Sequence, residues 1–241
     1  AVDLGINVIP EFDTPGHSLA FTRVWPELAR EDNAKYLDVT KPQALEKVKA
    51  LFDEYILPQG GEEEVFIGPE VNVGTDEYKT NGLPEADRTR YKEAFRGYID
   101  QILKHVKNRG KEPAFWGCLR ENAGTTPVTT DALMYAWYWD YSEALKALDA
   151  GYRVLTMDEM ETYIVPGGGW YVNQYGRGEH LYNTWLPNDN RAWDVSFAGD
   201  RAPAPKGHPR VVGGQFAVWN DWIGNGISSG DISFRIQYNI P

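Results

Sequence analysis

The sequence has few of the features that mark several large classes of protein. It contains a single cysteine, Cys118, among 241 residues, so the chain can form no internal disulfide and holds no cysteine-rich metal site. No apolar run approaches the roughly 20 residues that a membrane-spanning helix needs. The formal net charge is −11, and clusters of Lys and Arg are missing. The negative charge and the lack of Lys and Arg clusters argue against a nucleic-acid partner, because phosphate binding depends on such clusters.

Aromatic residues, by contrast, are abundant. The chain has 9 Trp, 14 Tyr and 9 Phe, which together make 13% of the residues. Aromatic side chains supply much of the buried area in any core. They also stack on the flat apolar faces of sugars. Composition leaves both interpretations open.

Strand-like and helix-like segments alternate along the chain. The predicted strands cover residues 6–10, 71–73, 113–117, 132–139, 152–158 and 213–222, and the predicted helices cover residues 41–56, 86–109 and 142–151. Strands separated by helices indicate βαβ units and a mainly parallel sheet, hence an α/β fold. No Pro- or Ser-rich linker separates two halves, so we expect residues 1–241 to form a single domain.

Polar and aromatic residues recur just past the predicted strands. These residues are Asp13, His17, Asp76, Glu77, Trp116, Trp137, Trp219 and Asp221. The first strand is followed by EFDTPGH, not by a glycine-rich phosphate-binding turn, which weakens the alternative of an open doubly wound sheet and predicts no cofactor. In an α/β barrel the βα-loops carry the site at one face. A barrel needs eight strands and about six are recognisable, so either two are missed or the chain is part of a longer domain.

Two adjacent acids, Asp76 and Glu77, follow the strand at 71–73. Two close carboxylates shift each other's pKa values apart, so one can keep its proton while the other stays ionised. His17 lies past the preceding strand, where an imidazole can orient a carboxylate or tune its pKa. The other histidines show no metal-ligand spacing, and we expect no metal site.

Three motifs together resemble one known family. GINVIPEFDTPGH (residues 5–17), VNVGTDEY (71–78) and GGQFAVWND (213–221) resemble, in order and spacing, motifs of glycoside hydrolase family 20, the β-N-acetylhexosaminidases. The resemblance implies a (β/α)8 TIM-type barrel. Against that pattern the chain lacks the first two strands and the end of the last helix, so we expect a partial catalytic barrel running from about strand 3 to strand 8 of a longer protein.

The resemblance also implies a mechanism and its residues. The family retains configuration by substrate assistance, an exception to the scheme with two catalytic carboxylates. Glu77 would be the general acid and later the base, Asp76 would accept the acetamide N–H, and Tyr163 would hold the acetamide oxygen. The family often shows Tyr-Leu-Asp where this chain has Tyr163-Ile164-Val165, so the usual Asp contact is not expected.

Further positions match substrate-binding residues of the family. Trp116, Trp137 and Trp219 match walls of the acetamido pocket, with Trp139 as a weaker alternative to Trp137, and Asp13 and His17 lie in the first motif. Asp221 stands where many members have Glu, contacting the outer hydroxyls of the sugar. Asp221, the YIVP run at residues 163–166 and Tyr171, which closely follows that run, together look most like the lacto-N-biosidase branch, which releases a disaccharide.

Two functions remain to be separated. The first is a retaining exo-glycosidase that acts on glycans ending in N-acetylhexosamine or lacto-N-biose, expected to be secreted or on a bacterial cell surface. The second is a carbohydrate-binding barrel without turnover. A barrel of the family 18 chitinase type is disfavoured, because the Asp-rich strand signature of that family is not in the sequence.

Overall fold

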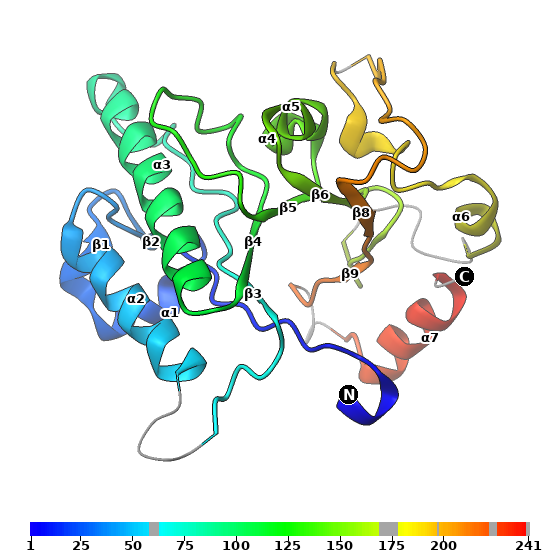
Figure 1. Cartoon of the computed structure of the whole chain (residues 1–241), viewed down its shortest axis with the longest axis horizontal. Coiled ribbons are helices and arrows are strands. Elements are labelled where there is room, and N and C mark those ends of the chain that lie inside the picture. The colour runs from blue at the N-terminus through cyan, green and yellow to red at the C-terminus, as the bar shows by residue number, and fades with distance from the viewer. Residues whose placement is uncertain (58–62, 169–177, 197, 222–225, 240–241) are drawn as a thin grey trace. The chain divides into compact units, whose positions relative to one another are not determined.

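The computed structural model describes residues 1–57, 63–168, 178–196, 198–221 and 226–239 (Figure 1). The chain divides into two units, residues 1–134 and 135–241. The first unit contains η1 (Val2–Leu4), α1 (Leu19–Val24), η2 (Pro26–Leu28), β1 (Ala29–Arg30), β2 (Asn33–Leu37), α2 (Pro42–Ile56), β3 (Glu70–Asn72), α3 (Glu85–Asn108) and β4 (Glu112–Trp116). The second contains α4 (Trp139–Ser142), α5 (Ala144–Ala150), β6 (Arg153–Thr156), β7 (Tyr163–Ile164), α6 (Gly178–Thr184), η3 (Arg191–Trp193), β8 (Val211–Gly214), β9 (Ala217–Val218) and α7 (Ser229–Asn239). β5 (Leu133–Ala136) spans the junction.

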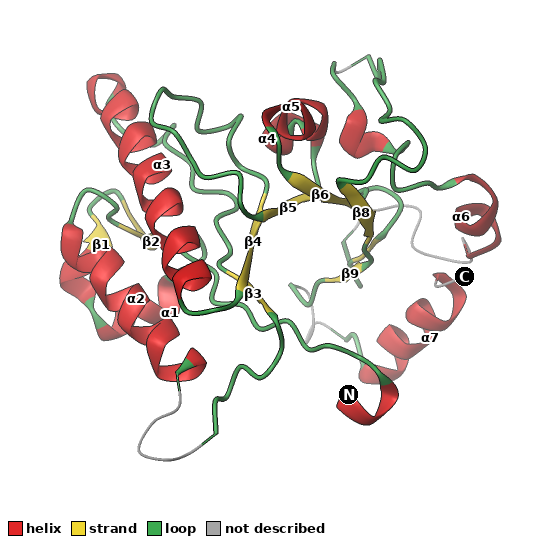
Figure 2. Cartoon of the chain, viewed as in Figure 1, coloured by secondary structure: helices red, strands yellow, loops and turns green. Residues whose placement is uncertain are grey.

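The first unit is built around a βαβ crossover. β3 and β4 pair in parallel, with Val71 opposite Pro113, and α3 connects them and contacts β4 (Figure 2). A parallel pair needs such a crossover because the chain must return to the same end of the sheet. α3 buries a stripe at helical spacing that includes Phe95, Ile99 and Ile102. The helix stops before Gly110, whose φ of +83° suits the residue after a helix end.

The predicted elements of this unit are confirmed with one exception. The helices expected at 41–56 and 86–109 are α2 and α3, and the strand expected at 113–117 is β4. The buried strand expected at 6–10 is wrong. This segment is extended and the Asn72 N–H donates to the Pro10 carbonyl oxygen over 2.9 Å, but Ile6 and Val8 are 54% and 60% exposed. Burial requires a covering layer, and none lies over these side chains in the described part of the chain.

The second unit contains two parallel strand pairs. β6 pairs with β8, and β7 pairs with β9. The strand expected at 132–139 is shorter, since β5 ends at Ala136 and α4 begins at Trp139. The strand expected at 213–222 is two short strands, β8 and β9, which pair with different partners. Among the described helices, none has both the length and the apolar character that a bilayer crossing requires.

Two glycines allow the loop after residues 6–10 and the loop after β3 to touch. A Cβ added at Gly74, whose φ is +75°, would overlap the Cα and carboxylate of Asp13. A Cβ added at Gly16 would lie 2.5 Å from the carbonyl oxygen of Asp76. The Thr75 N–H donates to the Asp13 carboxylate over 3.3 Å. The absence of side chains at these two positions therefore sets Asp13 directly against the loop that carries Asp76.

This close approach predicts unequal costs for two otherwise similar substitutions. Gly74→Ala and Gly110→Ala both place a side chain at positive φ, a strain of about 1–2 kcal/mol. Only Gly74→Ala also drives a methyl group into Asp13, whereas nothing lies within 4 Å of a Cβ at Gly110. We expect the free energy of unfolding, measured by denaturant titration, to fall by about 1 kcal/mol for Gly110→Ala and by about 3 kcal/mol or more for Gly74→Ala. Equal losses would contradict the close approach.

Candidate active site

The structure brings both carboxylates of the acid pair onto one imidazole. His17 Nε2 lies 3.3 Å from an oxygen of Asp76 and 3.4 Å from an oxygen of Glu77. Neighbours on a regular strand point to opposite faces, but Thr75 and Glu77 have φ values of +94° and +51°, so the chain leaves the strand geometry before the acids. His17 also has positive φ, +47°. Three residues other than glycine in this region of φ are unusual, and such strain concentrates at functional sites.

These contacts alter the charges of the site. Hydrogen bonds to Asp76 and Glu77 raise the pKa of His17 to about 11, so the imidazole is a cation at neutral pH. The hydrogen bond from His17, together with one from Lys79, lowers the pKa of Glu77 to about 2. Partial burial, followed by the charge of Asp76, raises the pKa of Asp13 well above its usual range. The site therefore contains an ionised Glu77, a protonated His17 and an Asp13 that favours its neutral form.

Asp13, His17 and Asp76 are also close enough for a metal ion, because each offers a ligand atom within 4.8 Å of the others. A metal ion would require the neutral imidazole, whose ring nitrogen carries a free lone pair. The two carboxylates raise the pKa of His17, so a metal ion would have to displace the imidazole proton. We interpret the cluster as a set of ion pairs and assign no metal to it.

Trp116, at the end of β4, is the predicted aromatic wall that lies in the first unit. Its side chain is buried, and its Nε1–H donates to Glu11 over 3.1 Å. Thr75 Oγ1 donates to the Trp116 carbonyl oxygen over 3.0 Å, which ties the acid loop to β4. The hydrogen bonds fix the orientation of the indole relative to the acid loop.

Two charged residues near the acid pair, Lys79 and Glu121, were not predicted from the sequence. Lys79 Nζ lies 2.8 Å from a carboxylate oxygen of Glu77. Glu121 is half-buried in the loop after β4, and burial raises its pKa to about 7, with Lys79 the largest opposing charge. The spacing of Glu77 and Lys79 could have suggested the first contact. No signal in the sequence places Glu121, because it comes from a loop 44 positions away from Glu77.

In the second unit, strand pairing brings Tyr163 and Trp219 together. β7 begins with Tyr163, and the Trp219 N–H donates to the Ile164 carbonyl oxygen over 3.0 Å just past β9. The two rings meet edge to face with centroids 5.6 Å apart. Tyr163 is buried and Trp219 is half-buried. The phenol expected to hold the acetamide oxygen and one expected aromatic wall are therefore neighbours.

The remaining predicted residues differ in their solvent exposure. Trp137 follows β5 directly and is half-buried, whereas the alternative Trp139 is buried at the start of α4, so Trp137 is the better candidate for a ligand contact. Asp221 is exposed in the turn after β9. Tyr171 lies outside the described residues.

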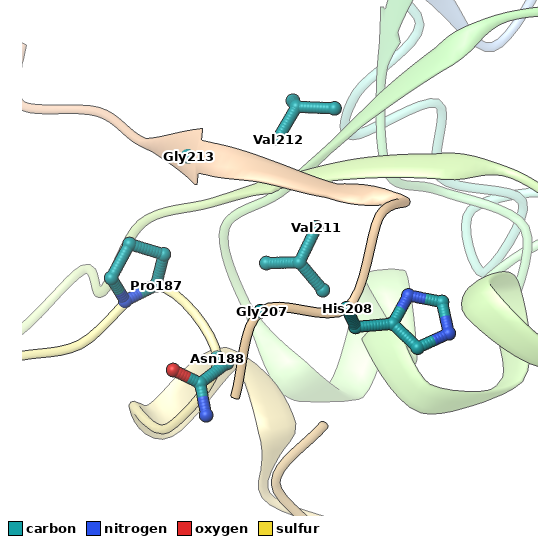
Figure 3. Close-up of a pocket in the computed structure, with 7 residues that line it drawn as sticks. All are labelled: Pro187, Asn188, Gly207, His208, Val211, Val212 and Gly213. Atoms are coloured by element: carbon teal, nitrogen blue, oxygen red, sulfur yellow. The ribbon is translucent and has the colours of Figure 1, made fainter. Parts of the chain in front are cut away.

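The second unit also contains a pocket. It encloses about 170 Å³ and is lined by Pro187, Asn188, Gly207, His208, Val211, Val212 and Gly213 (Figure 3). Its wall includes the beginning of β8. None of the predicted site residues lines it.

Comparison with protein families gives a match over almost the whole chain. The model described as the catalytic domain of glycosyl hydrolase family 20 matches residues 1–229. The lacto-N-biosidase of Bifidobacterium bifidum is 26% identical over 92% of this chain and 20% of its own length. A β-hexosaminidase of Vibrio furnissii is 28% identical over 93% of this chain and 38% of its own length. The chain thus spans less than half the length of these relatives.

Solved structures show the same fold. Dispersin B matches with a TM-score of 0.73 at 15% identity, over 99% of this chain and 72% of that chain. A structure of the tandem family 20 catalytic modules of the pneumococcal exo-β-D-N-acetylglucosaminidase matches with a TM-score of 0.72 at 19% identity, over 99% of this chain and 60% of that chain. The likeness confirms the predicted α/β fold of the TIM-barrel type.

The ion pairs of His17 predict how this residue titrates. An unperturbed histidine titrates between about pH 5 and pH 8, but a folded pKa near 11 keeps His17 charged throughout that range. We expect the ring C–H signals of His17, assigned by their loss in His17→Gln, to show no titration there by NMR. Because the folded pKa lies above the ordinary value, the ion pairs stabilise the fold fully below about pH 6.5 and lose this effect as the pH rises toward 11.

The variant Glu77→Gln supplies the control for this measurement. It removes one of the two carboxylates that hold the proton, so the pKa of His17 should fall by about 1 unit or more. A midpoint near 6.5 in the unchanged protein would refute the ion-pair geometry.

Proposed function

Because this chain belongs to glycosyl hydrolase family 20, we propose that it provides the catalytic groups of a retaining exo-acting β-N-acetylhexosaminidase. In this reaction the 2-acetamido group of the substrate is the nucleophile. The observation that carries the proposal is the placement of Asp76 and Glu77 on the same imidazole, at 3.3 Å and 3.4 Å from His17 Nε2. Two neighbouring carboxylates in one site can then act on two different parts of the same sugar.

In the first step, Glu77 gives its proton to the glycosidic oxygen while the bond from that oxygen to the anomeric carbon breaks. The acetamide oxygen forms the new bond to the anomeric carbon, and a positively charged oxazolinium ring results. The carboxylate of Asp76 accepts the acetamide N–H and stabilises this charge. General acid catalysis of this kind contributes about 10²- to 10⁴-fold to a rate.

The second step reverses the roles. Glu77, now a carboxylate, removes a proton from water, and the water oxygen attacks the anomeric carbon and displaces the acetamide oxygen. Two inversions at the same carbon give net retention. In the proposed binding mode, Tyr163 holds the acetamide oxygen, and Trp116, Trp137 and Trp219 form walls of the pocket.

We further propose a disaccharide, lacto-N-biose, as the released unit. The similarity to the lacto-N-biosidase of Bifidobacterium bifidum supports this choice. The exposed Asp221, shorter than the Glu found in many members of the family, supports it as well, because a shorter side chain leaves room beyond the sugar hydroxyl. An enzyme for such glycan termini would act outside the cell, so a secreted or surface-attached bacterial protein is part of the same proposal.

The second candidate function is carbohydrate binding without turnover. The resting charge of Glu77 favours it, because a carboxyl whose pKa is lowered to about 2 holds no proton to donate at neutral pH. The presence of the acid pair and of Tyr163 favours catalysis. Turnover of a chromogenic N-acetylglucosaminide by the complete protein separates the two.

Substitution of the acid gives a test of the mechanism. We expect Glu77→Gln in the complete protein to lower kcat about 10²- to 10⁴-fold on natural glycosides, and much less on aryl glycosides whose leaving group needs no proton. Substrate binding, measured by calorimetry, should persist. Glu112→Gln, which removes a carboxylate paired with Lys107 at the start of β4, is the matched control and should leave the rates unchanged. Unchanged rates in Glu77→Gln would exclude it as the acid.

The released product tests the substrate. Incubation of the complete protein with lacto-N-tetraose should give lacto-N-biose and lactose, identified by chromatography against standards. Release of single galactose would overturn the acetamido mechanism, since no acetamido sugar would then occupy the cleavage site. Cleavage of a simple N-acetylglucosaminide alone would keep the mechanism and exclude the disaccharide. No cleavage of either would favour the binding barrel.

A further inference from the structure

The resting site contains a conflict that the proposed function must resolve. Glu77 is held by two cations, His17 at 3.4 Å and Lys79 at 2.8 Å, and both favour its ionised form. A general acid must carry a proton when the leaving group departs. His17 stays charged and is shared with Asp76, so Lys79 is the cation whose departure would let Glu77 take up a proton.

Glu121 provides a second position for the Lys79 ammonium. Its Oε2 atom is buried and has no hydrogen-bond partner among the described residues. A buried carboxylate oxygen without a partner is costly, so this side chain favours a proton or a cation. Lys79 is the largest opposing charge that acts on it. The Oε2 atom of Glu121 therefore has no hydrogen-bond partner in the described part of the chain, whereas a carboxylate oxygen of Glu77 is paired with Lys79.

The backbone keeps these residues next to each other. Asn122, which follows Glu121, donates from Nδ2 to the carbonyl oxygen of Tyr78, which precedes Lys79, over 3.1 Å. Arg30 Nη2 donates to the Lys79 carbonyl oxygen over 2.8 Å. The main chain of Lys79 is therefore fixed, while its side chain is 36% exposed and has the rotational freedom of four methylene groups.

We propose that Lys79 is shared between Glu77 and Glu121, and that its passage to Glu121 prepares Glu77 to act as the general acid. This inference rests on the proposed function, in which Glu77 is the acid. In the first state Lys79 pairs with ionised Glu77, and Glu121 carries a proton. In the second state Lys79 pairs with ionised Glu121, and Glu77 carries the proton. One proton leaves Glu121 and one reaches Glu77 through solvent, so the net charge does not change.

The other charged and titratable groups that face this pair do not offer the same exchange. His17 and Asp76 act on Glu77 or Glu121 from the acid loop and its neighbour, Lys92 acts on Glu121 from α3, and Tyr36 of β2 faces Lys79 and Glu77. The raised pKa of Glu121, about 7, supports a proton on this residue near neutral pH. Glu121 and Lys79 are thus positioning residues for Glu77, and neither needs to touch the substrate.

The test is the pH dependence of kcat/KM in the complete protein, on a substrate that needs acid assistance. The alkaline limb of the profile reports the pKa of the acid in the free enzyme. Glu121→Gln removes the alternative position, so Lys79 stays on Glu77 and the limb should move to lower pH by about 1 unit. Lys79→Met removes a cation from Glu77, so the limb should move to higher pH. Glu121→Gln should have no further effect in the Lys79→Met background.

Controls separate positioning from a structural role. Lys107→Met and Glu112→Gln remove an ion pair of the same length, 2.8 Å, at the other end of β4, and should leave the limb in place. A structural defect in Glu121→Gln would lower the rate at every pH without moving the limb. The proposal is overturned if Glu121→Gln leaves the limb unmoved, or moves it equally with and without Lys79.

A readout that does not require turnover keeps this test independent of the proposed function. If the unchanged protein cleaves no substrate, the proposed function fails, and the sharing of Lys79 is tested by ¹³C NMR titration of the glutamate carboxyls. Lys79→Met should then raise the pKa of both Glu77 and Glu121, and Glu121→Gln should lower the pKa of Glu77 only while Lys79 is present. Carboxyls that titrate independently would overturn the proposal.

Discussion

The contact between two loops, residues 11–17 and 74–77, determines the position of almost every charged group in the first unit's part of the site. Gly16 and Gly74 let the two backbones approach to a distance that no side chain would allow. As a result, Asp13 loses solvent and lies beside Asp76, and His17 reaches both acids of the pair. A displacement of either loop would change the charges of several groups together, because each group sets the protonation of the next.

A buried arginine also supports the loop that follows β3. Arg30 is 1% exposed, pairs with Asp32 over 2.6 Å and lies with its guanidinium carbon 4.3 Å from the ring centroid of Tyr36 and 4.7 Å from that of Tyr78. Burying a cation is costly unless its interactions are satisfied, and aromatic faces together with a carboxylate offset much of that cost. Arg30 also donates a hydrogen bond to the Lys79 carbonyl oxygen. These contacts therefore hold the main chain of Lys79, the residue whose side chain contacts Glu77.

The sequence could predict the parts of this site that depend on local pattern. The amphipathic spacing of α2 and α3 is visible in the sequence, and the motif around Asp76 and Glu77 ends a strand as expected. The exposed segment 6–10 could not be predicted, because apolar composition reports a tendency to be buried but not which element does the covering. The contact between Tyr163 and Trp219 depends on pairing between β7 and β9, two short strands 54 positions apart. The proposed role of Glu121 depends on one loop packing on another, which leaves no local signal in the sequence.

The resting charges of the site balance, which is compatible with the neutral sugar that we propose as substrate. Asp76 and Glu77 are matched by the cations His17 and Lys79, while Asp13 favours its neutral form. In the proposed exchange, a proton on Glu77 becomes favourable when Lys79 moves away, and Glu121 accepts this cation without a change in net charge. In the proposed reaction, Asp76 and His17 then remain paired beside the acetamide, where positive charge develops on the oxazolinium ring. A preorganised carboxylate at that position stabilises the transition state more than the uncharged substrate, which is the condition for catalysis.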